Sequence, residues 1–133
     1  MRLRKAVMTL WVPCNPNPKH AHVEDCVIRA IAIATGTKWY EVYDSLCKFG
    51  RNEANVPSAN AVWGKYLYLV GFEPFLLPEA CPTCTTVKRF CDMFPTGTFI
   101  IGTGSHAVAV IDGDYFDSWD SGDEIPSYFW RVK

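Results

Sequence analysis

The fold is organised around residues 23–36, which read Val23-Glu-Asp-Cys-Val-Ile-Arg-Ala-Ile-Ala-Ile-Ala-Thr-Gly36. Apolar residues recur there at the three- and four-residue spacing of one helix face, and Gly36 suits the left-handed conformation in which many helices end. Asp25 is expected to cap the first turn, because a carboxylate accepts hydrogen bonds from the free N–H groups there. Cys26 follows at the start of the helix, where the helix dipole favours a thiolate. The stretch therefore predicts either an activated nucleophile or one more buried small hydrophobe.

The composition indicates one globular domain over residues 1–133. Of the 133 residues 49% are hydrophobic, and the formal net charge is -1. No basic patch suggests a nucleic-acid partner, and no apolar run approaches membrane-spanning length. The basic residues at the N-terminus are followed by an apolar stretch too short for an export signal. We therefore expect a cytoplasmic protein without membrane contact, in which the six cysteines are reduced thiols and not a disulfide framework.

Helix-like patterns fill the first half of the chain and strand-like patterns the second, which is typical of an α+β fold. Thr37 and Ser58 are expected to cap the second and third helices, and Gly50 and Gly71 to end them. The predicted helices after the first cover residues 37–50, 58–71 and 86–94, and the predicted strands cover residues 6–12, 72–77, 98–102, 106–111, 115–119 and 128–132.

His106 begins the strand-like run His-Ala-Val-Ala-Val-Ile, which Asp112-Gly113 turns into a hairpin. With a two-residue turn, Ile111 pairs with Asp114, and Asp117 falls on the face of the hairpin that carries His106. A three-residue turn would favour Asp120 instead. The carboxylate could orient the imidazole and stabilise its charged form, or it could simply bond to a backbone group or an arginine. Gly102 and Gly104, just before His106, are expected to leave room for a substrate or another backbone.

A cysteine at a helix start, then a strand histidine, then a carboxylate on the next strand resembles the papain-like cysteine peptidases. The segments around Cys26 and from His106 to Ser121 are similar to small bacterial and phage members, in the bacteriocin leader-peptidase-like and Josephin-like branches. The resemblance implies a papain-like fold, in which the cysteine helix of the N-terminal half packs on an antiparallel sheet from the C-terminal half. It also implies cleavage of a peptide or isopeptide bond through a thioester, without a cofactor.

The same resemblance implies roles for individual residues. Cys26 would be the nucleophile, His106 its base and later the acid, and Asp117 the residue that holds His106. The Cys26 N–H and a side chain from the preceding loop would stabilise the oxyanion. Where the superfamily has a glutamine, this chain has His20, so the candidate donors are His20, Asn17 and Asn15.

Other patterns support other interpretations. Cys81-x-x-Cys84 with Cys91 is a partial zinc pattern, and the fourth ligand would come from Cys14, His20 or His22. A loop with two ordinary thiols is favoured over this pattern. Trp119, directly across the hairpin from His106, is expected to shield the catalytic pair or to floor the substrate cleft.

The preferred function is thus an intracellular thiol hydrolase, bacterial or phage-encoded, whose partner is a peptide or protein substrate. The first alternative is a non-catalytic interaction or virion-associated protein that keeps the fold. The second alternative is a zinc-stabilised binding module.

Overall fold

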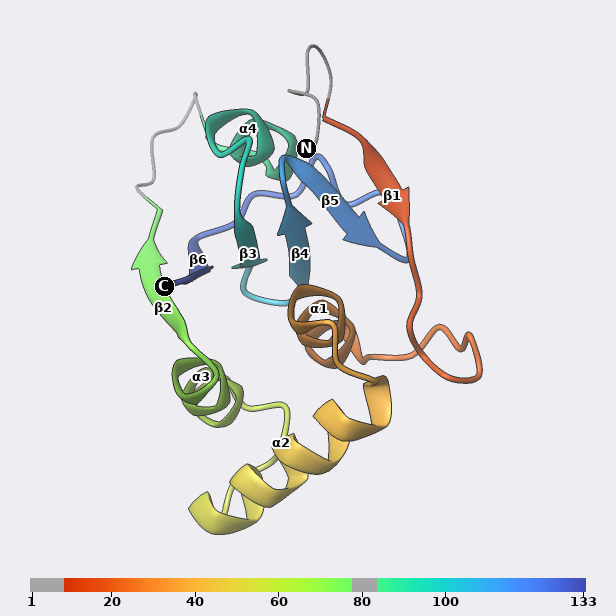
Figure 1. Cartoon of the computed structure of the whole chain (residues 1–133), viewed down its shortest axis with the longest axis vertical. Coiled ribbons are helices and arrows are strands. Elements are labelled where there is room, and N and C mark those ends of the chain that lie inside the picture. The colour runs from red at the N-terminus through yellow and green to blue at the C-terminus, as the bar shows by residue number, and fades with distance from the viewer. Residues whose placement is uncertain (1–8, 78–83) are drawn as a thin grey trace.

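The structure is a computed structural model that describes residues 9–77 and 84–133. The described residues form an α+β arrangement of four helices and one six-stranded sheet (Figure 1). In chain order the elements are β1 (Trp11–Pro13), α1 (Cys26–Thr35), α2 (Trp39–Glu53), α3 (Asn60–Leu69), β2 (Phe72–Leu76), α4 (Val87–Met93), β3 (Thr98–Gly102), β4 (Ala107–Ile111), β5 (Asp114–Asp117) and β6 (Tyr128–Val132).

The sheet is mixed, whereas the sequence predicted an antiparallel one. Its strand order is β1-β5-β4-β3-β6-β2, and every neighbouring pair is antiparallel except β1 and β5, which run parallel. Both edge strands, β1 and β2, precede the four central ones in the chain, so the sheet does not come from the C-terminal half alone. A long connection lies between β1 and β5, which is what a parallel pair requires.

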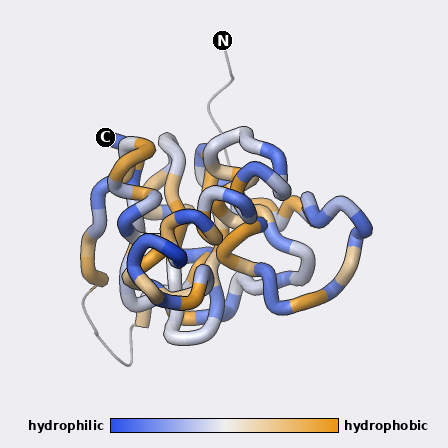
Figure 2. Tube along the Cα trace, turned by 90° about the horizontal axis from the view of Figure 1, so that it is seen from below, coloured by the Kyte–Doolittle hydropathy of each residue, from blue (hydrophilic) through white to orange (hydrophobic). Residues whose placement is uncertain are grey.

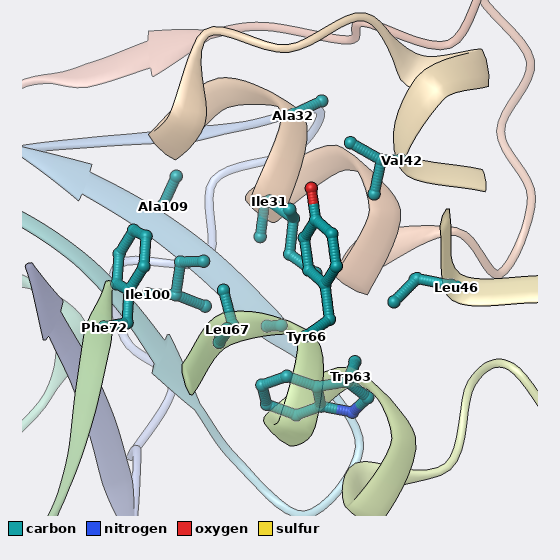
Figure 3. Close-up of a cluster of buried hydrophobic side chains, with 12 residues drawn as sticks. Ile31, Ala32, Val42, Leu46, Trp63, Tyr66, Leu67, Phe72, Ile100 and Ala109 are labelled. Atoms are coloured by element: carbon teal, nitrogen blue, oxygen red, sulfur yellow. The ribbon is translucent and has the colours of Figure 1, made fainter. Parts of the chain in front are cut away.

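Helices cover both faces of the sheet, because the central strands are apolar on both sides. Ile100 and Ala109 face the cluster formed with α1, α2 and α3 (Figure 3). Their neighbours along the strands, such as Ile101 and Val108, face the cluster that includes α4. In Figure 1, α1–α3 and α4 accordingly lie on opposite sides with the strands between them. The alternation of side chains along β3 and β4 thus divides the core in two.

Helix α1 begins and ends where the sequence predicted. Gly36 adopts the left-handed conformation with φ 67°, and its N–H bonds to Ala32. Asp25 occupies the N-cap position, but its side chain makes no capping hydrogen bond. That prediction was wrong because the carboxylate instead accepts bonds from side chains, Arg29 among them.

The other helices differ from prediction mainly at their ends. Helix α2 continues past Gly50 to Glu53, and its N-cap is Lys38, not Thr37. Gly50 lets the chain that follows the helix pass close to it, since a Cβ there would lie 2.7 Å from the Asn55 carbonyl oxygen. Helix α3 is preceded by Ala59 and not capped by Ser58. Helix α4 lies within the segment predicted as a helix over residues 86–94, and the Thr86 hydroxyl at its N-cap accepts a hydrogen bond from the Arg89 N–H.

Strands β2, β3 and β6 lie where strands were predicted, within one residue at each end. Residues 6–8 of the segment predicted as a strand over residues 6–12 lie outside the described residues, and within the described part the strand β1 begins at Trp11. Hydrophobic stretches cross the middle of the molecule, while hydrophilic ones are prominent at its periphery (Figure 2). Across the described ranges, no helix combines the length and the apolar character needed to cross a bilayer.

Candidate active site

The candidate site lies where the start of α1 meets one end of the sheet. Ile111 pairs with Asp114 across the hairpin, as the two-residue turn predicted. In this antiparallel pair the start of β4 therefore lies beside the end of β5. His106 immediately precedes β4, Asp117 is the last residue of β5, and Cys26 is the first residue of α1. Residues far apart in the sequence meet here because α1 packs directly on β4 and β5.

Cys26, His106 and Asp117 form a hydrogen-bonded chain. The His106 Nε2 lies 2.6 Å from the Asp117 Oδ2. His106 also shares a hydrogen bond with the Cys26 thiol, which interacts with the Ala107 N–H as well. The side chain of Thr103 accepts the His106 N–H at 2.9 Å and so fixes the turn that presents the ring.

The electrostatics of this chain favour a thiolate beside an imidazolium. Burial raises the pKa of Cys26, but hydrogen bonds from His106 and the Ala107 N–H, with the positive charges of His106 and Arg29, lower it below 9.0 overall. Burial lowers the pKa of His106, yet the Asp117 and Cys26 contacts raise it from 6.5 to about 9. Both net shifts act in the direction that favours transfer of the proton from the sulfur to the imidazole.

Asp117 is held by four hydrogen bonds, two on each oxygen. Oδ2 accepts from His106 and from the Ser121 hydroxyl, both at 2.6 Å. Oδ1 accepts from Arg29 at 3.0 Å and from the Ser118 N–H at 2.8 Å. Burial opposes ionisation, but these donors lower the pKa of Asp117 below 3.8. The alternative carboxylate, Asp120, instead accepts from the Tyr115 hydroxyl and the Gly122 N–H.

Arg29 was not recognised from the sequence. It is 6% exposed and bridges Asp25 and Asp117, with its Nε 2.7 Å from the Asp25 Oδ1. The available signal was its position, since it is the one charged residue in the apolar helix α1. A charge on a helix that is buried inside a domain needs a partner of opposite charge.

The three proposed oxyanion donors are not assembled at the site. The Asn17 amide donates to Asp25 at 3.0 Å, and the Asn15 amide donates to the Ala21 carbonyl at 3.1 Å. His20 is exposed, with a φ of 52°. None of these three is among the described residues that line the cavity at Cys26. They shape the loop that leads into α1, because Asn17 also accepts the Lys19 N–H at 2.9 Å.

A cavity of about 680 Å³ opens at Cys26 and His106. Trp119 lines it, is 43% exposed and packs on His106 with ring centroids 4.9 Å apart. Gly104 also lines it and has open space where a Cβ would be, as predicted. The space at Gly102 is instead filled by the Tyr128 ring, so that part of the prediction was wrong. The other walls come from α1, α2, α3 and the turn before His106.

The partial zinc pattern gains no support from the residues that the structure describes. Cys81 lies outside them, and Cys84 takes part in a disulfide bond, which is incompatible with zinc ligation through its thiolate. The expectation of reduced thiols is therefore wrong for Cys84, and Cys91 lies buried on α4. Within the described ranges, no three histidine, cysteine or acidic side chains are grouped so as to hold a metal ion.

Comparison with protein-family models, with curated proteins and with solved structures finds no match.

Proposed function

We propose that this protein is a thiol hydrolase that cleaves a peptide or isopeptide bond through a thioester on Cys26. The observation that carries the proposal is that His106 interacts with the Cys26 thiol and, through its Nε2, with the Asp117 carboxylate. A cysteine and a base within hydrogen-bond reach, with the base oriented by a third group, is the arrangement of an activated nucleophile. We also propose a papain-like fold, because α1 presents the cysteine against the sheet that carries the histidine and the carboxylate.

The reaction follows from the roles of these groups. The Cys26 thiolate attacks the carbonyl carbon, and a tetrahedral oxyanion forms. The His106 imidazolium then gives its proton to the leaving amine as the C–N bond breaks, which leaves a thioester and a neutral imidazole. His106 next takes a proton from water, hydroxide attacks the thioester, and the carboxylic acid and the thiol are released. Asp117 stays ionised throughout and stabilises the positive imidazolium.

The oxyanion would be stabilised by the start of α1. The side chain of Asp25 leaves the first-turn N–H groups uncapped, and Cys26, Val27 and Ile28 of that turn all line the cavity. Backbone N–H groups at a helix start carry partial positive charge and stabilise an anion. This donor set replaces the side-chain donor expected from the preceding loop.

The cavity walls favour a peptide segment with apolar side chains as the substrate. Tyr43 and Leu46 of α2, Trp63 of α3 and Tyr128 of β6 contribute largely apolar surface. Among the described residues of the lining, Glu24 is the one charged residue outside the buried network, and it is exposed. Such walls bind an extended apolar segment better than a small anionic molecule.

The test is the alkylation of the intact protein with iodoacetamide over a range of pH, with the modified cysteines identified by mass spectrometry. We expect Cys26 to react at pH 6, where the half-buried thiol of Cys47 still reacts slowly. The variant His106→Ala should abolish this difference. Turnover is then sought with a mixture of quenched fluorescent peptides, with Cys26→Ala as the control. A Cys26 that reacts no faster than Cys47 at pH 6 would contradict the proposal.

The second candidate is a binding protein that uses the same cavity without catalysis. It is favoured by one observation, the engagement of Asn15 and Asn17 within their own loop. A reactive Cys26 that releases no product from any peptide, together with saturable peptide binding, would support this candidate over the hydrolase.

A further inference from the structure

Arg29 lies one helical turn after Cys26 and contacts residues on both sides of the candidate site. Its Nη1 donates to the Asp117 Oδ1 at 3.0 Å and to the Ser118 hydroxyl at 2.9 Å. Its Nε donates to the Asp25 Oδ1 at 2.7 Å. The guanidinium thus joins the residue before the nucleophile to the carboxylate that binds His106.

Two neighbours keep this guanidinium in place through Asp25. The Asp25 Oδ2 accepts the Asn17 amide and the Trp39 indole N–H, each at 3.0 Å. Asp25 is therefore anchored both to the loop before α1 and to the start of α2. With one end fixed in this way, Arg29 has little freedom to move away from Asp117.

The contact determines which way the Asp117 carboxylate points. Arg29 and the Ser118 N–H hold Oδ1, so Oδ2 remains for His106 and Ser121. Rotation of the carboxylate away from His106 would break the contact with Arg29. Fixing the carboxylate in this way also fixes the imidazole that it binds.

Arg29 also completes an alternation of charge in a buried network. From one end to the other the signs run negative at Asp25, positive at Arg29, negative at Asp117, positive at His106 and negative at Cys26. Without the guanidinium, three negative groups would share a single positive one. Two buried carboxylates without enough positive charge disfavour any further negative charge nearby, and the thiolate is such a charge. A buried ion pair adds little net stability compared with apolar packing, so a role in stability alone does not explain this arginine.

We propose that Arg29 is a positioning residue that holds Asp117 toward His106 and thereby maintains the charged Cys26–His106 pair. The inference rests on the proposed function, because it assigns Arg29 a role in preparing the same nucleophile. It requires no contact between Arg29 and the substrate.

The experiment measures the ionisation of Cys26 directly, from its rate of alkylation by iodoacetamide as a function of pH. In Arg29→Met we expect the apparent pKa of the thiol to rise by about one unit, and the rate at pH 6 to fall about tenfold. In Arg29→Lys, which keeps the charge, the rise should be less than half as large. Lys65→Met removes a positive charge from the exposed ion pair with Glu53 and should leave the profile unchanged.

The outcomes separate this inference from the proposed function. A low thiol pKa in the wild type that stays the same in folded Arg29→Met would overturn the role of Arg29 and leave the hydrolase proposal standing. An ordinary thiol pKa in the wild type would overturn both. If Arg29→Met does not fold, Arg29→Gln carries the test, because it keeps an amide donor for Asp117 without the charge and should show the same rise. An equal rise in Arg29→Lys would also count against the inference.

Discussion

Replacing Asp117 by asparagine tests the centre of the network, because four donors point at this one carboxylate. In the wild type each oxygen accepts two hydrogen bonds. An asparagine can offer one oxygen, so its NH₂ group would face either Arg29 and the Ser118 N–H or His106 and Ser121. If the NH₂ group faces Arg29 and the Ser118 N–H, two donors meet a donor in a site where the carboxylate side chain is 1% exposed, and if it faces Ser121 and His106, Arg29 is left with a neutral partner.

The expected cost follows from the group that loses its partner. In either orientation buried Arg29 keeps only Asp25 as its counter-charge, and with the amide oxygen toward His106 the Ser118 N–H also loses a hydrogen bond. Breaking a buried ion pair in this way costs about 3 to 5 kcal/mol of the free energy of unfolding. With a urea m-value of about 2 kcal/mol/M, the midpoint should fall by about 2 M.

The assay is urea unfolding at pH 7, followed by circular dichroism, for the wild type, Asp117→Asn and Asp120→Asn. The last variant is a matched control, since one oxygen of Asp120 accepts both of its bonds, from Tyr115 and from the Gly122 N–H. An asparagine there keeps both bonds, so the midpoint should not change. Equal midpoints for wild type and Asp117→Asn, or a larger loss in Asp120→Asn, would refute the reasoning.

Acid unfolding gives a second measurement on the same group. Because the pKa of Asp117 is lower in the folded protein than the ordinary 3.8, the unfolded chain takes up the proton first. The contribution of this carboxylate to stability is therefore complete above pH 3.8 and is lost as the pH falls through the folded pKa. Asp117→Asn should show a shallower decline in stability over that acidic range than the wild type. A decline of equal slope in the two proteins would contradict this assignment.

Two further predictions concern the pH range of reactivity and the packing beside the cavity. With increasing pH, the kcat/KM of peptide hydrolysis should rise through the lowered pKa of Cys26 and then fall at about pH 9, where His106 loses the proton that the leaving amine needs. A kcat/KM profile that keeps rising above pH 9 would contradict this prediction. Gly102→Ala should lower the free energy of unfolding by about 1 to 3 kcal/mol, because the new methyl group overlaps the Tyr128 ring. Gly104→Ala is the control, since its methyl group meets open space, and it should unfold at the same urea concentration as the wild type.

Local sequence patterns determined the helix around Cys26 and the hairpin register. Apolar spacing and Gly36 define α1, and both features act within a few residues of the chain. The two-residue turn at Asp112-Gly113 fixes Ile111 opposite Asp114, and strand alternation then brings Asp117 toward His106. These are short-range rules, so the sequence alone predicted them.

Contacts between distant segments were decided by the tertiary structure. The sequence indicates that Asp25 caps the helix, but in the folded protein both residues are buried and the Asp25 carboxylate binds the Arg29 guanidinium and not the backbone N–H groups. Gly102 looks like an open position, but Tyr128 comes from a strand that pairs with β3 and fills the space. A residue pattern indicates which hydrogen bonds and contacts a side chain can make with its neighbours in the sequence. Which group becomes the partner depends on burial. An unpaired polar group or an empty space inside the protein costs free energy, so a buried side chain pairs with the partner that packing places nearest to it.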